Sequence, residues 1–333
     1  MRFITCLIFL ASMMSFLPKV HAADELVIYS SKNASYVKPL FDEYSRENGV
    51  AISFLVGPTP ALISRLEIEG KGNKADIILG TGASYFWTGS EKGLFATVPS
   101  RTLERNVPEH LKSPKNDWFS FSKRARTIIY NTEKVSESDL IGYADLADQK
   151  WQGRLCLRTS SADYSLSLIA MLIESHGVEN TKTTVEGWVN NLAVPPMQDD
   201  MQIVEAITEG ICDVGIINSY YYARLKREQP ETNLKLLWAD QNGSGVHINV
   251  TAAAVTANSS NKLQAIDFLE WLTTKQPQVR YANLSMEYPV NPKVYPAREV
   301  AKWGRFEEDN HPVAKAGENR KSALELIQNA HYK

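Results

Sequence analysis

Short apolar runs alternate with amphipathic stretches along this chain, and that alternation constrains its fold more than any other feature. In the N-terminal part, apolar residues recur at helical spacing in some stretches and form runs of strand length in others. The expected strands are residues 26–29, 51–56 and 75–79, and the expected helices are residues 35–48, which Gly49 ends, and 60–69. This order predicts a parallel sheet with helices on both faces, in which ligands lie at the carboxyl ends of strands.

A second series of the same kind occupies the C-terminal part of the chain. It comprises expected strands at residues 155–157, 214–217 and 234–238 and expected helices at residues 164–175, 201–209 and 322–330. Residues 125–130 and 249–256 are apolar strands placed to cross between the two series. The sequence therefore predicts an α/β protein of two domains, with two doubly wound sheets joined by crossover strands. On this interpretation one lobe is residues 23–125 plus 250–300, and the other is residues 126–249 plus 301–333.

The first 22 residues have the pattern of a cleaved signal peptide. Arg2 supplies the positive charge, residues 4–17 are apolar but too short to span a bilayer, and Val20-His21-Ala22 resembles a cleavage site. We therefore expect export to the periplasm, with no later membrane-spanning segment. Removing Arg2 and Lys19 from the 36 basic residues leaves 34 against 38 acidic ones, a formal charge of −4. This balance argues against a nucleic-acid-binding surface.

Two cysteines remain once the signal peptide is removed. Cys156 and Cys212 both lie in strand-like runs, and an even number of cysteines in an oxidising compartment favours a disulfide. The alternative is a pair of buried free thiols.

Three consecutive tyrosines, Tyr220, Tyr221 and Tyr222, follow the apolar run that ends at Asn218-Ser219. Phenolate is a hard anionic oxygen ligand that suits ferric iron, as in the tyrosine ligand of catalase haem. The alternative is that these tyrosines are ordinary amphipathic residues of core and surface. Signatures of nucleophilic, zinc, phosphate-loop and Cys-x-x-Cys chemistry are missing from the sequence, which argues against an enzyme.

A second strand end carries another tyrosine. Arg158-Thr159-Ser160-Ser161-Ala162-Asp163-Tyr164 follows the strand expected at residues 155–157. Because both polar stretches leave strands at their carboxyl ends, we expect them to reach the same cleft. Hydroxyl groups near the start of a helix, where free N–H groups and the positive dipole end lie, would suit an anion.

These stretches resemble those of the periplasmic ferric-ion-binding proteins of bacterial iron ABC transporters. The resemblance covers nearly all of the mature chain and is carried by the following segments: Val27-Ile28-Tyr29-Ser30-Ser31, Ala75-Asp76-Ile77-Ile78, Lys123-Arg124-Ala125-Arg126, Leu155-Cys156-Leu157-Arg158-Thr159-Ser160, Glu209-Gly210-Ile211-Cys212-Asp213, Asn218-Ser219-Tyr220-Tyr221-Tyr222 and Glu287-Tyr288-Pro289-Val290. It implies a type II periplasmic binding protein with a fold like one transferrin lobe. It also implies a monomer that closes on Fe(III) and delivers it to an inner-membrane permease and its ATPase.

The resemblance also implies which tyrosines bind the metal. Tyr220 and Tyr221 match the adjacent pair that binds Fe(III) in the family, and Tyr164 matches a third ligand of many members. Tyr222 falls where relatives carry an aromatic residue that packs. Tyr36 matches a further first-loop tyrosine that related proteins use at the site. The alternative, of equal weight, is that Tyr36 packs its helix against the core.

Some members add a histidine and a glutamate to the metal site. The corresponding positions here hold Asn33 and Thr81, so this chain is more similar to the branch that has three tyrosines and a bound carbonate, bicarbonate or similar anion. Lys32 is the nearest match to a basic residue that helps to hold the anion, although lysine lacks the fork of arginine.

Further candidates for the anion come from the residues themselves. We expect that role for Arg124, Arg126, Thr159, Ser160 and Asn218. The alternative for the two arginines is a strand of alternating exposed residues, and the alternative for Asn218 is a helix cap.

Two rival functions stay open at this point. One keeps the fold and binds a small anion or organic solute, such as a phosphonate, a polyamine or thiamine. The other is an exported hydrolase, for which the sequence offers no nucleophile–base signature.

Overall fold

The computed structural model describes residues 25–333, so the signal peptide expected at residues 1–22 lies outside the described residues. The strands are β1 (Glu25–Ser30), β2 (Ala51–Val56), β3 (Ile77–Thr81), β4 (Phe119–Asn131), β5 (Leu155–Cys156), β6 (Val214–Asn218), β7 (Leu234–Leu237), β8 (Ile248–Val255) and β9 (Tyr288–Pro289). The α-helices are α1 (Ala34–Asn48), α2 (Thr59–Glu69), α3 (Ala83–Glu91), α4 (Arg101–Asn106), α5 (Asp163–His176), α6 (Val178–Asn190), α7 (Asp200–Thr208), α8 (Ser219–Glu228), α9 (Lys262–Leu272), α10 (Lys275–Ser285), α11 (Arg298–Ala301), α12 (Lys315–Glu318) and α13 (Arg320–Asn329). Short 3-10 helices cover Gly70–Gly72, Glu109–Leu111, Glu137–Asp139, Ala144–Ala147 and Gln149–Trp151.

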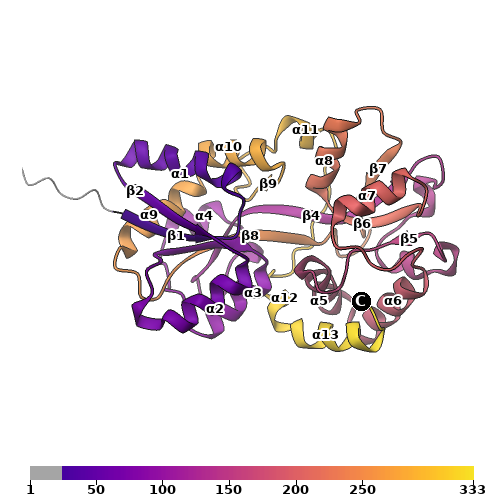
Figure 1. The fold of residues 1–333 in the computed structure, drawn as a ribbon, viewed down its shortest axis with the longest axis horizontal. Helices are drawn as coiled ribbons and strands as arrows, with labels where there is room; N and C mark the ends of the chain where they lie inside the picture. Colours follow the sequence, from indigo (N-terminus) through magenta and orange to yellow (C-terminus); the bar gives the residue numbers. More distant parts are fainter. Residues whose placement is uncertain (1–24) are drawn as a thin grey trace, which may run out of the picture.

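Strand β4 joins the two lobes of the molecule. Its first part, up to Ala125, pairs with β8, and its second part, from Arg126 onward, pairs with β6 and β7. Figure 1 shows β4 and β8 running between a lobe that carries β1, β2 and β3 and a lobe that carries β5, β6 and β7. The predicted crossover strands are thus present, and β4 begins earlier than expected, at Phe119.

The sheets are mixed rather than parallel throughout. β1 pairs in parallel with β2 and β3, and β5 pairs in parallel with β6. Strands β4 and β8, in contrast, run antiparallel to the strands beside them. The expected parallel sheet therefore holds for the βαβ units of each lobe. The expectation of a parallel sheet fails for the crossover strands β4 and β8. These two strands pass between the lobes in opposite directions, and each runs antiparallel to its neighbours.

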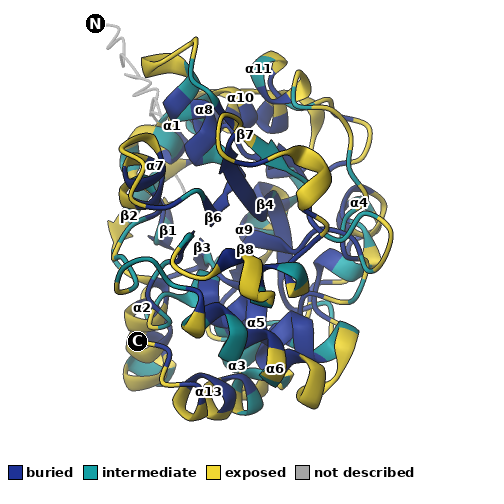
Figure 2. Cartoon of the chain, turned by 90° about the vertical axis from the view of Figure 1, so that its right-hand side faces the viewer, coloured by how far each residue is buried: buried dark blue, intermediate teal, exposed yellow. Residues whose placement is uncertain are grey.

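Packing of the C-terminal segment links both lobes. Helix α12 packs against α3 and α5, and α13 packs against α5 and α6. The strands at the centre are buried, as Figure 2 shows for β4, β6 and β8. The residue boundaries given above for the lobes stay a prediction. Among the helices of residues 25–333, none is long and apolar enough to cross a membrane.

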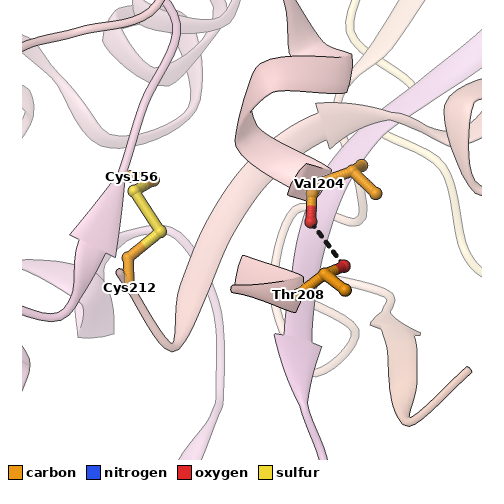
Figure 3. Close-up of a disulfide and its surroundings, with 4 residues drawn as sticks. All are labelled: Cys156, Val204, Thr208 and Cys212. Carbon is orange, nitrogen blue, oxygen red and sulfur yellow. Dashed lines mark hydrogen bonds between the residues drawn. A yellow bond between two sulfur atoms is a disulfide. The ribbon is translucent and has the colours of Figure 1, made fainter. Parts of the chain in front are cut away.

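A disulfide joins β5 to the turn before β6. Cys156 and Cys212 are bonded, with their Cα atoms 5.9 Å apart, and both are buried. Figure 3 shows the bond beside helix α7, in which the Thr208 hydroxyl donates to the Val204 carbonyl. The predicted bridge is present, and it ties β5 to the start of β6, the two strands from which the chain continues to the tyrosines.

Candidate metal centre

The three predicted phenols come from the first turns of two helices. Tyr164 is the second residue of α5, and Tyr220 and Tyr221 are the second and third residues of α8. Helix α8 directly follows β6, and α5 comes a few residues after β5; the two strands pair in parallel, with Leu155 opposite Val214. Their carboxyl ends therefore meet at one edge of the sheet, as the sequence predicts.

The electrostatics of Tyr220 show that the phenols form one cluster. The rings of Tyr220 and Tyr221 lie 4.5 Å apart between centroids. Burial, followed by the proximity of Tyr164 and Tyr221, raises the pKa of Tyr220 well above its usual value. Burial also raises the pKa of Tyr221. Both phenols are therefore protonated at neutral pH.

Tyr222 has different surroundings from its two neighbours in the chain. Its hydroxyl donates to the Leu234 carbonyl at 3.2 Å, and its ring packs against Trp303 with 5.5 Å between centroids. These contacts fit the packing role expected for Tyr222.

Three guanidinium groups surround the ring of Tyr164. The Cζ atoms of Arg124, Arg126 and Arg158 lie 5.3, 6.0 and 5.2 Å from its centroid. The side chains of Arg124 and Arg126 are 0% and 2% exposed. The alternative of an exposed, alternating strand is therefore wrong for both arginines, because β4 is covered on both sides where it crosses between the lobes.

The charge of Arg126 is balanced within the protein. Its Nη1 lies 3.1 Å from Asp200, and Arg158 reaches the other oxygen of this carboxylate at 3.5 Å. Asp200 also accepts the backbone N–H of Asn218 at 2.9 Å, which fixes the start of α8. Sequence reasoning missed Asp200, since nothing in the sequence of α7 marks a carboxylate that points toward β4.

Lys32 is likewise paired with a carboxylate. Its Nζ lies 2.7 Å from the Glu287 carboxylate. Glu287 also accepts hydrogen bonds from the hydroxyl groups of Ser122 at 2.5 Å and Thr251 at 3.3 Å. Burial is the largest influence on the pKa of Lys32 and would lower it, but Glu287, Tyr281 and Tyr164 together raise it. Burial would likewise raise the pKa of Glu287, but Lys32 and Arg124 together lower it. Both groups are therefore charged, and the structure places a carboxylate where we expected only an external anion.

Arg124 keeps free donors despite its burial. Its Nη1 donates to Thr251 at 2.9 Å and lies 3.8 Å from Glu287, whereas its Nε and Nη2 have no hydrogen-bond partner among the described residues. Asn218, also fully buried, has no partner for either side-chain atom in the same part of the chain. Asn218 occupies the N-cap position of α8, as the capping alternative expected, but its side chain makes no capping hydrogen bond there. Buried donors without partners are costly and point to a ligand.

The hydroxyl groups before α5 are less available. The Ser160 hydroxyl donates to the Tyr332 carbonyl at 2.9 Å, and its N–H donates to the Lys333 carbonyl at 2.9 Å. The Thr159 hydroxyl lies 3.1 Å from that of Ser161. The C-terminus thus uses both groups of Ser160, which makes it the weakest of the predicted anion contacts.

Arg224, which sequence reasoning also missed, connects Tyr36 with the tyrosine pair. Its Cζ lies 5.2 and 4.8 Å from the ring centroids of Tyr220 and Tyr221, and its Nη2 donates to the Tyr36 hydroxyl at 3.5 Å. Tyr36 lies on α1 of the other lobe and also packs against the hydrophobic core. Arg224 lies three residues after Tyr221 on α8, and this spacing is the sequence signal that could have identified it.

Within the part of the chain that the structure describes, ordinary metal ligands do not gather elsewhere. Residues 25–333 contain no group of three or more His, Cys, Asp or Glu side chains that could hold a metal ion. The tyrosine cluster is therefore the candidate metal centre of the described chain.

The fold and this cluster define a two-lobed solute-binding protein of the periplasmic type. The family model of bacterial extracellular solute-binding proteins matches residues 39–308, and the chain belongs to this family. The iron uptake protein A1 of Synechocystis is 35% identical over 93% of this chain and 88% of its own length. The Fe(3+)-binding periplasmic protein of Serratia marcescens is 26% identical over 96% of this chain and 94% of its own length.

Solved structures give the same result. A Trichodesmium protein in complex with iron and citrate ligands has a TM-score of 0.89 and is 36% identical, covering 93% of this chain and 100% of its own. A ferric binding protein from Campylobacter jejuni has a TM-score of 0.86 and is 28% identical, covering 92% of this chain and 100% of its own. The resemblance inferred from the sequence and the two-lobed fold are both confirmed.

Proposed function

We propose that this protein captures Fe(III) between its lobes through the phenolates of Tyr164, Tyr220 and Tyr221, together with a small anion. The observation that carries this proposal is the convergence of three phenols on buried guanidinium groups at one strand edge. The relatives' names support iron as the cargo, and hinge closure of two lobes is a known way to enclose a ligand.

The chemistry of the cluster fits a hard trivalent cation. Phenols with raised pKa values stay neutral in the free protein, so Fe(III) must displace their protons. Three phenolates balance the charge of Fe(III), and an added anion makes the assembly negative. Arg124, which has free donors and lies beside Tyr164, offsets that charge. This account requires no histidine or carboxylate ligand.

The anion site that we propose centres on Arg124 and Asn218 rather than on Lys32. Arg124 and Asn218 have buried atoms without partners among the described residues, whereas Lys32 is held by Glu287 at 2.7 Å. Carbonate or bicarbonate is small enough for two or three such donors. Arg126 and Thr159 would support the anion site without contacting the anion directly, because each already has a partner.

The remaining parts of the proposed function follow from the family. The protein would work in the periplasm, after loss of residues 1–22, as a monomer. It would release iron to an inner-membrane ABC permease driven by its ATPase, and it would not turn over a substrate. Tyr36, linked to the site through Arg224, would complete the iron shell or pack beside it.

A ferric titration of the purified protein tests this function. With bicarbonate at neutral pH we expect a purple-red phenolate-to-iron absorption band that saturates at one iron per chain. The matched experiment replaces ferric salt by a phosphonate, a polyamine or thiamine and follows binding by calorimetry. A protein that stays colourless with iron but binds one of these solutes would have the rival function.

A further inference from the structure

One side chain beside the metal centre joins the two lobes. Asp163 directly precedes Tyr164 in α5, and its Oδ1 accepts from the Ser84 hydroxyl of α3 at 2.8 Å. Helix α3 follows β3 of one lobe, whereas α5 belongs to the lobe that contains β5. Figure 1 shows α3 and α5 on either side of α12, which contacts both.

The surroundings of Asp163 are shaped for this contact. A Cβ atom at Gly82, the residue before α3, would lie 2.3 Å from Asp163 Oδ2, and Gly82 has a φ of +97° that favours glycine. Arg320 of α13 approaches Asp163 Oδ1 at 3.5 Å and lies over the Tyr85 ring, with 5.3 Å from Cζ to the centroid. The side chain of Asp163 is only 13% exposed.

We propose that Asp163 is a positioning residue that holds the lobes closed and fixes Tyr164 at the metal. The inference rests on the proposed function, because it assigns Tyr164 to the iron. The first turn of α5 carries Asp163 and Tyr164 together, so a bond from Asp163 to α3 restrains Tyr164 relative to the opposite lobe. Opening the lobes must break this bond before iron can leave, and the contact therefore slows release.

The test compares Ser84→Ala with Ser90→Ala. Both serines lie on α3, but the Ser90 hydroxyl donates to Asp117 at 2.6 Å, a bond that stays within one lobe. Iron-loaded protein is mixed with a strong chelator, and loss of the visible band is followed by stopped flow. Because Ser84→Ala removes one buried hydrogen bond between the lobes, it should speed release about tenfold, while Ser90→Ala should leave it unchanged. Equal release from Ser84→Ala and the wild type would overturn the proposal.

A double-mutant cycle identifies the partner. The Ser84→Ala/Asp163→Ala pair should speed release by about as much as Asp163→Ala alone, because Asp163→Ala already removes the bond to Ser84 together with the ion pair to Arg320. Additive effects of the two substitutions would contradict a direct contact.

Small-angle scattering of the ligand-free proteins gives a readout that needs no iron. Ser84→Ala should shift the population toward the open form relative to the wild type and Ser90→Ala, and identical curves would overturn the contact between lobes. If the wild type binds no iron, the proposed function fails, and the scattering still decides whether Asp163 joins the lobes.

Discussion

Tyr221 and Tyr222 are neighbours with the same side chain, yet the structure gives them different tasks. Consecutive helical residues point about 100° apart, as 3.6 residues make one turn. Tyr221 therefore packs beside Tyr220 and Arg224, while Tyr222 turns to Trp303 and the Leu234 carbonyl. The position of each residue in the first turn of α8 decides which phenol is available to a metal.

Substituting these two tyrosines separates the roles. Tyr221→Phe should weaken iron binding by at least about 100-fold and remove much of the visible band, because losing a ligand costs more than losing a residue that supports one. Tyr222→Phe keeps the ring packing and should leave the band unchanged. Visible spectra with ferric titrations check both, and an unaltered Tyr221→Phe spectrum would remove Tyr221 from the site.

The buried pair of Lys32 and Glu287 gives a second prediction at this scale. Glu287→Gln leaves the ammonium of Lys32 buried without its counter-charge, which should lower the free energy of unfolding by about 3 kcal/mol. Bicarbonate with iron should restore part of this loss, since an anion can then pair with Lys32 and Arg124. Denaturant unfolding with and without ligand measures both. Equal stability of Glu287→Gln and the wild type would show that the pair carries no such charge.

Sequence reasoning located the phenols because they follow strands in visible motifs. It missed Glu287 and Asp200 as parts of the site because each acts through a tertiary contact. Lys32 and Glu287 are 255 residues apart in the chain, and no periodicity records such a pair.

At the scale of elements, strongly apolar strands and amphipathic helices were predictable and packing-dependent ones were not. Strand β2 has the predicted bounds of residues 51–56, and α5 and α7 begin one residue before their predicted starts. Helix α10 was not predicted, since its buried face includes the polar residues Gln278 and Ser285 and apolar periodicity is therefore weak. Its packing against α1 and β9 stabilises it instead.

The disulfide is the element-scale feature with the largest expected effect on stability. It closes a loop with a sequence separation of 56 between the strands that lead to the tyrosines. Replacing both Cys156 and Cys212 by alanine should lower the free energy of unfolding by about 2–4 kcal/mol. The iron band should keep its position, because the bridge lies behind the site. Thermal unfolding and spectra of the double variant check this, and a displaced band would mean that the bridge shapes the metal shell.

At the scale of the whole molecule, the proposed closure on iron would couple iron capture to proton release. The pKa values of Tyr220 and Tyr221 are raised, so both phenols are protonated throughout the neutral range, and binding the metal would release their protons to the solvent. Acid therefore opposes binding, and affinity should fall as pH falls, by up to about tenfold per pH unit for each phenol displaced. Competition with a chelator between about pH 8 and pH 6 measures the slope. A flat profile would contradict binding through phenolates.

We propose that Tyr164, Tyr220 and Tyr221 bind one ferric ion where the lobes meet. A crystal of the iron-loaded protein measured at the iron absorption edge locates the metal directly. We expect one anomalous peak within bonding distance of the three phenol oxygens, with an anion between the peak and Arg124. A peak at another place, or phenol oxygens beyond bonding distance from it, would contradict the claim.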